Sequence, residues 1–201
     1  MNFVGAALKA TPADIDRIAA DLKVEPAAFR AVLEVEAAGS GFDKKGRPKA
    51  LFERHHFFRN LKALPDQQAE AVAAGLAYPK WGEKPYPKGS DAVYDEIERA
   101  CAINEDAALL STSWGLGQIM GFNYRMIGRP SVLAMVTEAM DSEAGQLRHV
   151  AAFIRASGLQ DALMTRNWAK VARGYNGPGY AKNAYDVKLA KAYAKFSGRS
   201  T

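Results

Sequence analysis

The chain has 201 residues, of which 48% are hydrophobic, and it contains a single cysteine, Cys101. A chain of this length can bury a substantial core without cross-links, and one cysteine excludes an internal disulfide framework. The net charge of +5 favours an anionic partner, such as a nucleic acid, a membrane surface or an acidic wall polymer. Because no Arg-rich cluster or aromatic RNA-binding motif accompanies this charge, we expect no nucleic acid among the partners.

The N-terminal segment MNFVGAALKA carries only a short apolar run before Lys9 and a helix-start signal at residues 11–14. No signal peptide or membrane span is readable in it. We therefore expect a protein that starts in the cytoplasm.

Helical periodicity dominates the rest of the chain. Apolar residues recur at helical spacing in segments 12–22 and 26–38, and each segment begins with or next to a proline, which is favoured in the first helical turn. The segment GSGFDKKGRPKALF, residues 39–52, breaks this pattern: DKKG is typical of a turn and KALF of a short strand, which together predict a small β-hairpin. Further helices are expected at 66–76, 91–109, 131–139, 141–157, 159–173 and 181–197. With no internal repeat or linker, the prediction is one mainly α-helical domain over residues 1–201.

The predicted helix 26–38 carries two glutamates with different expected environments. Each helical residue advances by about 100°, which places Glu36 on the apolar arc of Val32 and Val35, whereas Glu34 falls on the opposite, solvated side. An apolar environment raises the pKa of a carboxyl group, and a raised pKa suits an acid that protonates a leaving group near neutral pH. Glu36 is therefore either a general acid or a structural carboxyl group bonded to a backbone amide or an arginine.

A general acid for glycoside cleavage usually works with a second carboxylate across the cleft. Asp43 lies in the turn DKKG, where an aspartate ordinarily bonds the backbone of its own turn, and we assign it that role. Glu53 directly follows the predicted strand KALF, and a hairpin that folds back would bring it opposite Glu36. The alternative for Glu53 is an ion pair with Arg54 or a neighbouring histidine.

The stretch STSWGLGQIMG, residues 111–121, combines three glycines with a tryptophan and a glutamine. Glycine is favoured where the backbone turns sharply or is approached closely, and a glutamine amide offers both a donor and an acceptor. The stretch predicts the wall of a ligand site, or else a turn that links two helices. A second glycine-rich turn, YNGPGY, precedes the last predicted helix.

The histidines give no metal motif. His55 and His56 are adjacent, and with His149 as the remaining histidine there is no HExxH or CxxC spacing, so we expect no metal site. A zinc amidase or peptidase that assembles its ligands from distant positions stays open as an alternative.

Three blocks stand in a fixed order: EAAGSGF with GRPKALFERHHF, then STSWGLGQIMG, then ARGYNGPGY. This order resembles the lysozyme-like superfamily, which includes goose-type lysozymes and lytic transglycosylases. It is most similar to the N-acetylmuramidase family of phage endolysins. The resemblance extends from about Ala10 to Phe196 and implies a lysozyme-like α-helical fold with a small β-hairpin beside the catalytic cleft.

The resemblance also implies roles for individual residues. Glu36 takes the place of the catalytic acid, and Glu53 that of the acidic residue in the Leu-Phe-Glu segment, as a base or an electrostatic stabiliser. In this interpretation the Tyr175 hydroxyl orients Glu36, the Asn176 amide bonds an N-acetyl group, and Gln118 reads polar groups of a glycan that the glycines allow to lie close. The substrate-binding residues implied are Ser113, Trp114, Gln118, Tyr175 and Asn176.

The implied activity is hydrolysis of the β-1,4 bond between N-acetylmuramic acid and N-acetylglucosamine in peptidoglycan, without a metal or organic cofactor. The protein would act as a monomer without a separate wall-binding module. It would accumulate in the host cytoplasm and reach the wall after the membrane is opened. Ala37 stands where many lytic transglycosylases have serine, so a lytic transglycosylase stays open as one alternative and a non-catalytic peptidoglycan-binding protein as another.

The last predicted helix aligns Lys188, Lys191, Lys195 and Arg199 on one stripe. This stripe is either the solvated face of a docked helix or a basic tail attracted to anionic envelope surfaces.

Overall fold

The computed structural model describes residues 1–37 and 39–198, with the side chain of Asn176 left out. The α-helices are α1 Pro12–Asp21, α2 Pro26–Glu36, α3 Arg54–Asn60, α4 Pro65–Ala73, α5 Ser90–Leu110, α6 Val132–Asp141, α7 Glu143–Ala156, α8 Gln160–Met164, α9 Trp168–Asn176 and α10 Tyr185–Ser197. Two 3-10 helices are η1 Gly121–Asn123 and η2 Tyr180–Asn183. None of the helices in the described part of the chain is long and apolar enough to cross a membrane.

The predicted mainly α-helical class is confirmed. One predicted helix, 159–173, is wrong, because Arg166 has a φ of 58° and the chain breaks there into α8 and α9. Asn167 then caps α9 by accepting a hydrogen bond from the amide of Lys170. The sequence does not predict α3, which begins directly after Glu53.

The β-structure differs from the local hairpin expected within 39–52. The strands β1 Ala50–Phe52, β2 Thr112–Trp114 and β3 Ile119–Met120 form an antiparallel sheet in the order β1-β2-β3. Strand β1 pairs with β2, whereas within 39–52 only an isolated bridge between Phe42 and Pro48 closes the turn. The predicted strand KALF therefore forms, but its partner comes from the STSWGLGQIMG stretch.

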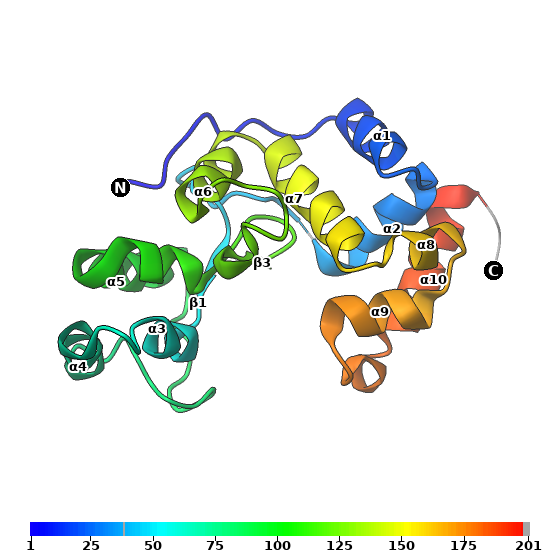
Figure 1. The fold of residues 1–201 in the computed structure, drawn as a ribbon. Helices are drawn as coiled ribbons and strands as arrows, with labels where there is room; N and C mark the ends of the chain where they lie inside the picture. The colour runs from blue at the N-terminus through cyan, green and yellow to red at the C-terminus, as the bar shows by residue number, and fades with distance from the viewer. Residues whose placement is uncertain (38, 199–201) are drawn as a thin grey trace.

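The described residues pack into two hydrophobic clusters, which divide the molecule into two lobes (Figure 1). The sheet lobe consists of β1–β3 with α3–α6, and the helical lobe of α1, α2, α8, α9 and α10. Helix α7 lies between them: Leu147 and Val150 belong to the core of the helical lobe, whereas Phe153 packs against that of the sheet lobe. Helix α10 lies beside α2 and α9 and closes the helical lobe.

Candidate active site

Glu36 is the last residue of α2 and lines an open cleft of about 580 Å³. Val35 of α2 lies beside it, and most of the other lining residues come from the sheet and from the segments joined to it. These residues are Asp43, Lys49, Ala50, Leu51, Ser90, Val93, Gly115, Leu116 and Gln118. Glu36, the expected acid, and the glycine-rich turn between β2 and β3 therefore line the same cleft.

Gln118 occupies this turn with a φ of 48° and an exposed side chain. Its Nε2 donates to the carbonyl of Gly115 at 2.8 Å, and its Oε1 accepts from the buried hydroxyl of Ser113 at 2.9 Å. Both halves of the amide are therefore held by the protein. Ser113 lies behind Gln118 and orients it, instead of facing the cleft itself.

The glycines of this turn allow other parts of the protein to approach. A Cβ atom on Gly115 would lie 2.7 Å from Cγ of Gln146, and one on Gly117 would lie 2.3 Å from Cγ2 of Val150. At Gly121 it would lie 2.1 Å from the carbonyl oxygen of Leu109. The space on the side of an added Cβ is therefore filled by protein atoms, whereas Gly115 also lines the cleft, where close approach of a glycan stays a prediction.

Trp114, predicted as a substrate-binding residue, lies in the core of the sheet lobe. Its side chain is 1% exposed, its indole Nε1 donates to the carbonyl of Leu109 at 3.1 Å, and its ring stacks on Phe3 with centroids 5.6 Å apart. An indole enclosed in this way cannot contact a glycan in the cleft. Trp114 instead anchors strand β2 in the core of the sheet lobe.

Tyr175 lies on α9 and is close to both Glu36 and the glycine-rich turn. Its hydroxyl donates to the carbonyl of Gly117 at 3.2 Å, and its ring meets that of Phe153 edge-on. Burial, together with the negative charge of Glu36, raises the pKa of Tyr175 above its ordinary value. Tyr175 thus links the acid-bearing side of the cleft to the turn, whereas the side chain of Asn176 lies outside the described part of the structure.

Glu53 lies at the end of β1, where it precedes α3. Its Oε2 accepts from the Tyr86 hydroxyl at 2.7 Å and lies 3.2 Å from Nδ1 of His55. The neighbouring Arg54 pairs instead with the buried Glu96 at 2.6 Å. Glu53 is not among the described residues that line the cleft of Glu36. It lines another, smaller pocket together with Tyr86.

The turn role predicted for Asp43 is confirmed. Its Oδ1 accepts from the backbone amides of Lys45 and Arg47, and its Oδ2 accepts from the Ser90 hydroxyl at 2.6 Å and from Nε of Arg47. Burial raises the pKa of Asp43, but the hydrogen bonds from Ser90 and Arg47 outweigh burial and bring it below its ordinary value. Asp43 also lines the cleft with Glu36, which the sequence does not predict, because this proximity depends on tertiary packing.

The two adjacent histidines occupy one aromatic cluster. The rings of His55 and His56 lie 4.2 Å apart, and His56 also packs against Phe122 at 5.0 Å. Burial, with the charge on His55, lowers the pKa of His56 to about 4. Within residues 1–37 and 39–198, no three histidine, cysteine or acidic side chains gather as they would around a metal ion.

Comparisons with known proteins show the family to which the chain belongs. The model of the N-acetylmuramidase family matches residues 25–197, which include α2, the sheet and α10. Among solved structures, the chain is similar to the Burkholderia AP3 phage endolysin, with 43% identity and a TM-score of 0.87 over 94% of this chain and 72% of that chain. A search of curated proteins gave no match. The chain belongs to the N-acetylmuramidase family, a family of glycoside hydrolases that act on peptidoglycan.

Proposed function

We propose that this protein is an endolysin that hydrolyses the β-1,4 bond between N-acetylmuramic acid and N-acetylglucosamine, with Glu36 as the general acid. The observation that carries the proposal is the position of Glu36 at the end of α2, in a cleft whose other wall is the Gln118 turn. Membership of the muramidase family and the likeness to a phage endolysin support the substrate and the biological role.

In the proposed reaction, Glu36 gives its proton to the glycosidic oxygen as the bond from that oxygen to the anomeric carbon breaks. The sugar passes through an oxocarbenium-like transition state, and water supplies the oxygen for the new reducing end. The proton lost by this water restores Glu36 or passes to a second carboxylate. The step therefore needs no co-reactant other than water.

We propose Glu53 as the second carboxylate, acting through a water molecule or through its charge. Its hydrogen bond from Tyr86 fixes the position of the carboxylate, and Ala50 and Leu51 of the same strand line the cleft. Asp43 is the competing candidate, since it lines the cleft together with Glu36. For substrate contacts we propose Gln118, oriented by Ser113, and Tyr175 with Asn176.

The proposed cellular course is accumulation in the host cytoplasm and access to the wall once the membrane is opened. Lys188, Lys191 and Lys195 of α10 are exposed, and they line a groove of about 440 Å³ that shares Val35 with the cleft. Lys195 also pairs with Glu34 at 2.7 Å. This basic groove supports attraction to an anionic envelope surface. Arg199 of the predicted stripe lies outside the described residues.

The test is Glu36→Gln, which keeps the shape of the side chain and removes the acid. We expect activity on purified peptidoglycan to fall by about 10²- to 10⁴-fold, the usual contribution of a general acid, with an unchanged circular dichroism spectrum. Glu34→Gln is the matched control, because Glu34 lies two residues away on the same helix with its side chain exposed. Unreduced activity in Glu36→Gln would disprove the proposed role.

Mass spectrometry of the released fragments identifies the bond and the reaction. Muramic acid ends that borohydride reduces are expected for a muramidase. Anhydro-muramic acid ends would instead make the protein a lytic transglycosylase. Intact glycan strands with cut peptides would contradict glycosidase activity, and a bound but undegraded wall would indicate a binding protein.

A further inference from the structure

Helix α7 carries two buried polar side chains that bond segments beside the cleft, Glu143 in its first turn and Gln146 one turn later. Glu143 is 8% exposed and Gln146 only 1%. A buried carboxylate or amide is costly unless its polar atoms are bonded, so the partners of these two side chains show which segments they hold.

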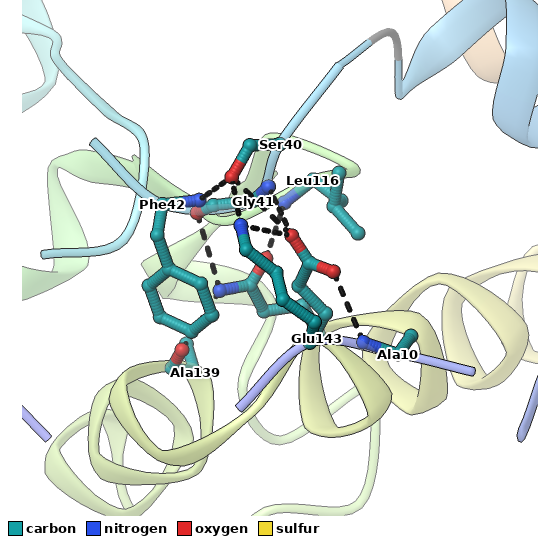
Figure 2. Close-up of polar contacts among 9 residues, drawn as sticks. Ala10, Ser40, Gly41, Phe42, Leu116, Ala139 and Glu143 are labelled. Carbon is teal, nitrogen blue, oxygen red and sulfur yellow. Dashed lines mark hydrogen bonds and ion pairs between the residues drawn. The ribbon is translucent and has the colours of Figure 1, made fainter. Parts of the chain in front are cut away.

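Glu143 holds the segment that follows Glu36 (Figure 2). Its Oε1 accepts from the backbone amide of Gly41 at 2.8 Å, and its Oε2 accepts from the amide of Ala10 at 3.0 Å. Lys9 donates to the same carboxylate and also to the hydroxyl of Ser40. Burial raises the pKa of Glu143, but the bonds from Gly41, Ala10 and Lys9 outweigh it, so the group is held as an anion.

Gln146 bonds two separate segments beside the cleft at once. Its Nε2 donates to the carbonyls of Gly41 at 3.3 Å and Ala139 at 2.8 Å, while its Oε1 accepts from the amide of Leu116 at 2.8 Å. Gly41 belongs to the segment after Glu36, and Leu116 lines the cleft in the turn that carries Gln118. One amide therefore connects the segment that follows Glu36 to the turn that carries Gln118.

The glycines on both sides are required for this contact. A Cβ atom on Gly41 would lie 2.1 Å from Oε1 of Gln146, and a Cβ atom on Gly115 would lie 2.7 Å from its Cγ. No side chain fits at those distances from a buried amide. Gly41 of EAAGSGF and Gly115 of STSWGLGQIMG thus serve a common purpose, which is to admit Gln146 between the two segments.

We propose that Gln146 is a positioning residue, which sets the spacing between Glu36 and the Gln118 turn through its bonds to Gly41 and Leu116. Glu143 anchors the same segment from the adjacent helical turn. The inference rests on the proposed role of Glu36 as the acid. Small misplacements of a catalytic group have large effects on rate, because the proton must be delivered to one oxygen atom.

The variant Gln146→Met tests this role, because methionine has a similar length and lacks the three hydrogen bonds. The matched control is Gln160→Met, since Gln160 also donates from Nε2 to a backbone carbonyl, that of Leu22, in the helical lobe. On soluble, uncross-linked peptidoglycan strands, we expect kcat of Gln146→Met to fall by about 10- to 100-fold with a smaller change in KM. The control is expected to keep kcat within about twofold at a temperature where both variants are folded.

A double-mutant comparison separates positioning from general loss of structure. If Gln146 acts through Glu36, then Gln146→Met should not lower the residual rate of Glu36→Gln any further. An equal fold-decrease in the wild-type and Glu36→Gln backgrounds would overturn the inference, and so would an unchanged kcat in Gln146→Met. A fully active Glu36→Gln would instead overturn the proposed function, so the two failures are distinguishable.

Glu143→Gln provides a second variant if Gln146→Met does not fold. It keeps an acceptor for one of the two backbone amides and removes the charge. We expect a decrease of about 10-fold in kcat, again absent in the Glu36→Gln background. A wild-type kcat, or a decrease of the same size in both backgrounds, would count against the inference.

Discussion

The two lobes are built from different kinds of side chain. The core of the sheet lobe is rich in large aromatic residues, namely Phe3, Phe52, Phe57, Tyr94 and Trp114. The core of the helical lobe consists mainly of alanine, valine and leucine, with Phe29 and Tyr193 as its buried aromatic residues. Aromatic rings fill the space around short strands, whereas small residues let helices such as α2 and α10 pack closely along their length.

This difference shows how the cleft is made. Each lobe packs around its own core, the helical lobe contributes Glu36, and the sheet lobe contributes the Gln118 turn. The width of the cleft therefore depends on parts that contact both lobes. Tyr175 packs against both clusters, and α7 carries Gln146.

Removing one large ring from each core is expected to have the largest effect on stability. Trp114→Ala and Phe29→Ala should each lower the free energy of unfolding by about 3–5 kcal/mol, because each leaves a cavity in place of a buried ring. If the two cores are separate, amides of α5 should lose hydrogen-exchange protection first in Trp114→Ala, and amides of α2 and α10 first in Phe29→Ala. Exchange measured by mass spectrometry, with denaturant unfolding, checks both parts. Uniform loss of protection in both variants would mean that the lobes unfold as one unit.

Glu53 and Asp43 are the two candidates for the second carboxylate, and removing the charge of each in turn shows which one contributes more to kcat. We expect Glu53→Gln to lower kcat by about 100-fold, at the lower end of acid–base contributions, and Asp43→Asn to have a smaller effect. Asp43→Asn also weakens the contacts with Arg47, so the thermal midpoint of each variant is needed alongside the rate. A larger loss of kcat in a folded Asp43→Asn would transfer the role to Asp43, which lines the cleft together with Glu36.

The smallest expected effect concerns pH and the aromatic cluster of the sheet lobe. The pKa of His56 is about 4 in the folded protein and 6.5 in an unfolded chain. Between these values the unfolded chain binds a proton that the folded protein does not, so the free energy of unfolding falls as the pH decreases from 6.5 to 4. In His56→Phe this fall should be shallower, although His55 and His149, whose pKa values are also lowered, still contribute. Urea unfolding at pH 7 and pH 5 gives the decrease in the free energy of unfolding for each protein. An equal decrease in the wild type and in His56→Phe would refute the prediction.

Local signals in the sequence were sufficient for most of the helices. Periodicity located α1, α2 and α5 closely, prolines marked the starts of α1 and α2, and the family blocks indicated the fold and the enzyme class. The break at Arg166 escaped prediction, because the apolar pattern continues through it and only the backbone conformation shows the interruption. Helical geometry predicted different environments for Glu34 and Glu36, and in the structure Glu34 is exposed whereas Glu36 lines the cleft.

The sequence by itself determined which residues are apolar, where helices begin and which carboxyl group ends α2, because these are properties of neighbouring residues. Only the tertiary structure decided that β1 pairs with β2, that Trp114 lies in the core and that Glu53 occupies its own pocket. It also decided that Gly41 and Gly115, which belong to two distant motifs, both contact Gln146. Such contacts join segments far apart in the chain, and a pattern of local spacing contains no information about which distant segment will be the partner.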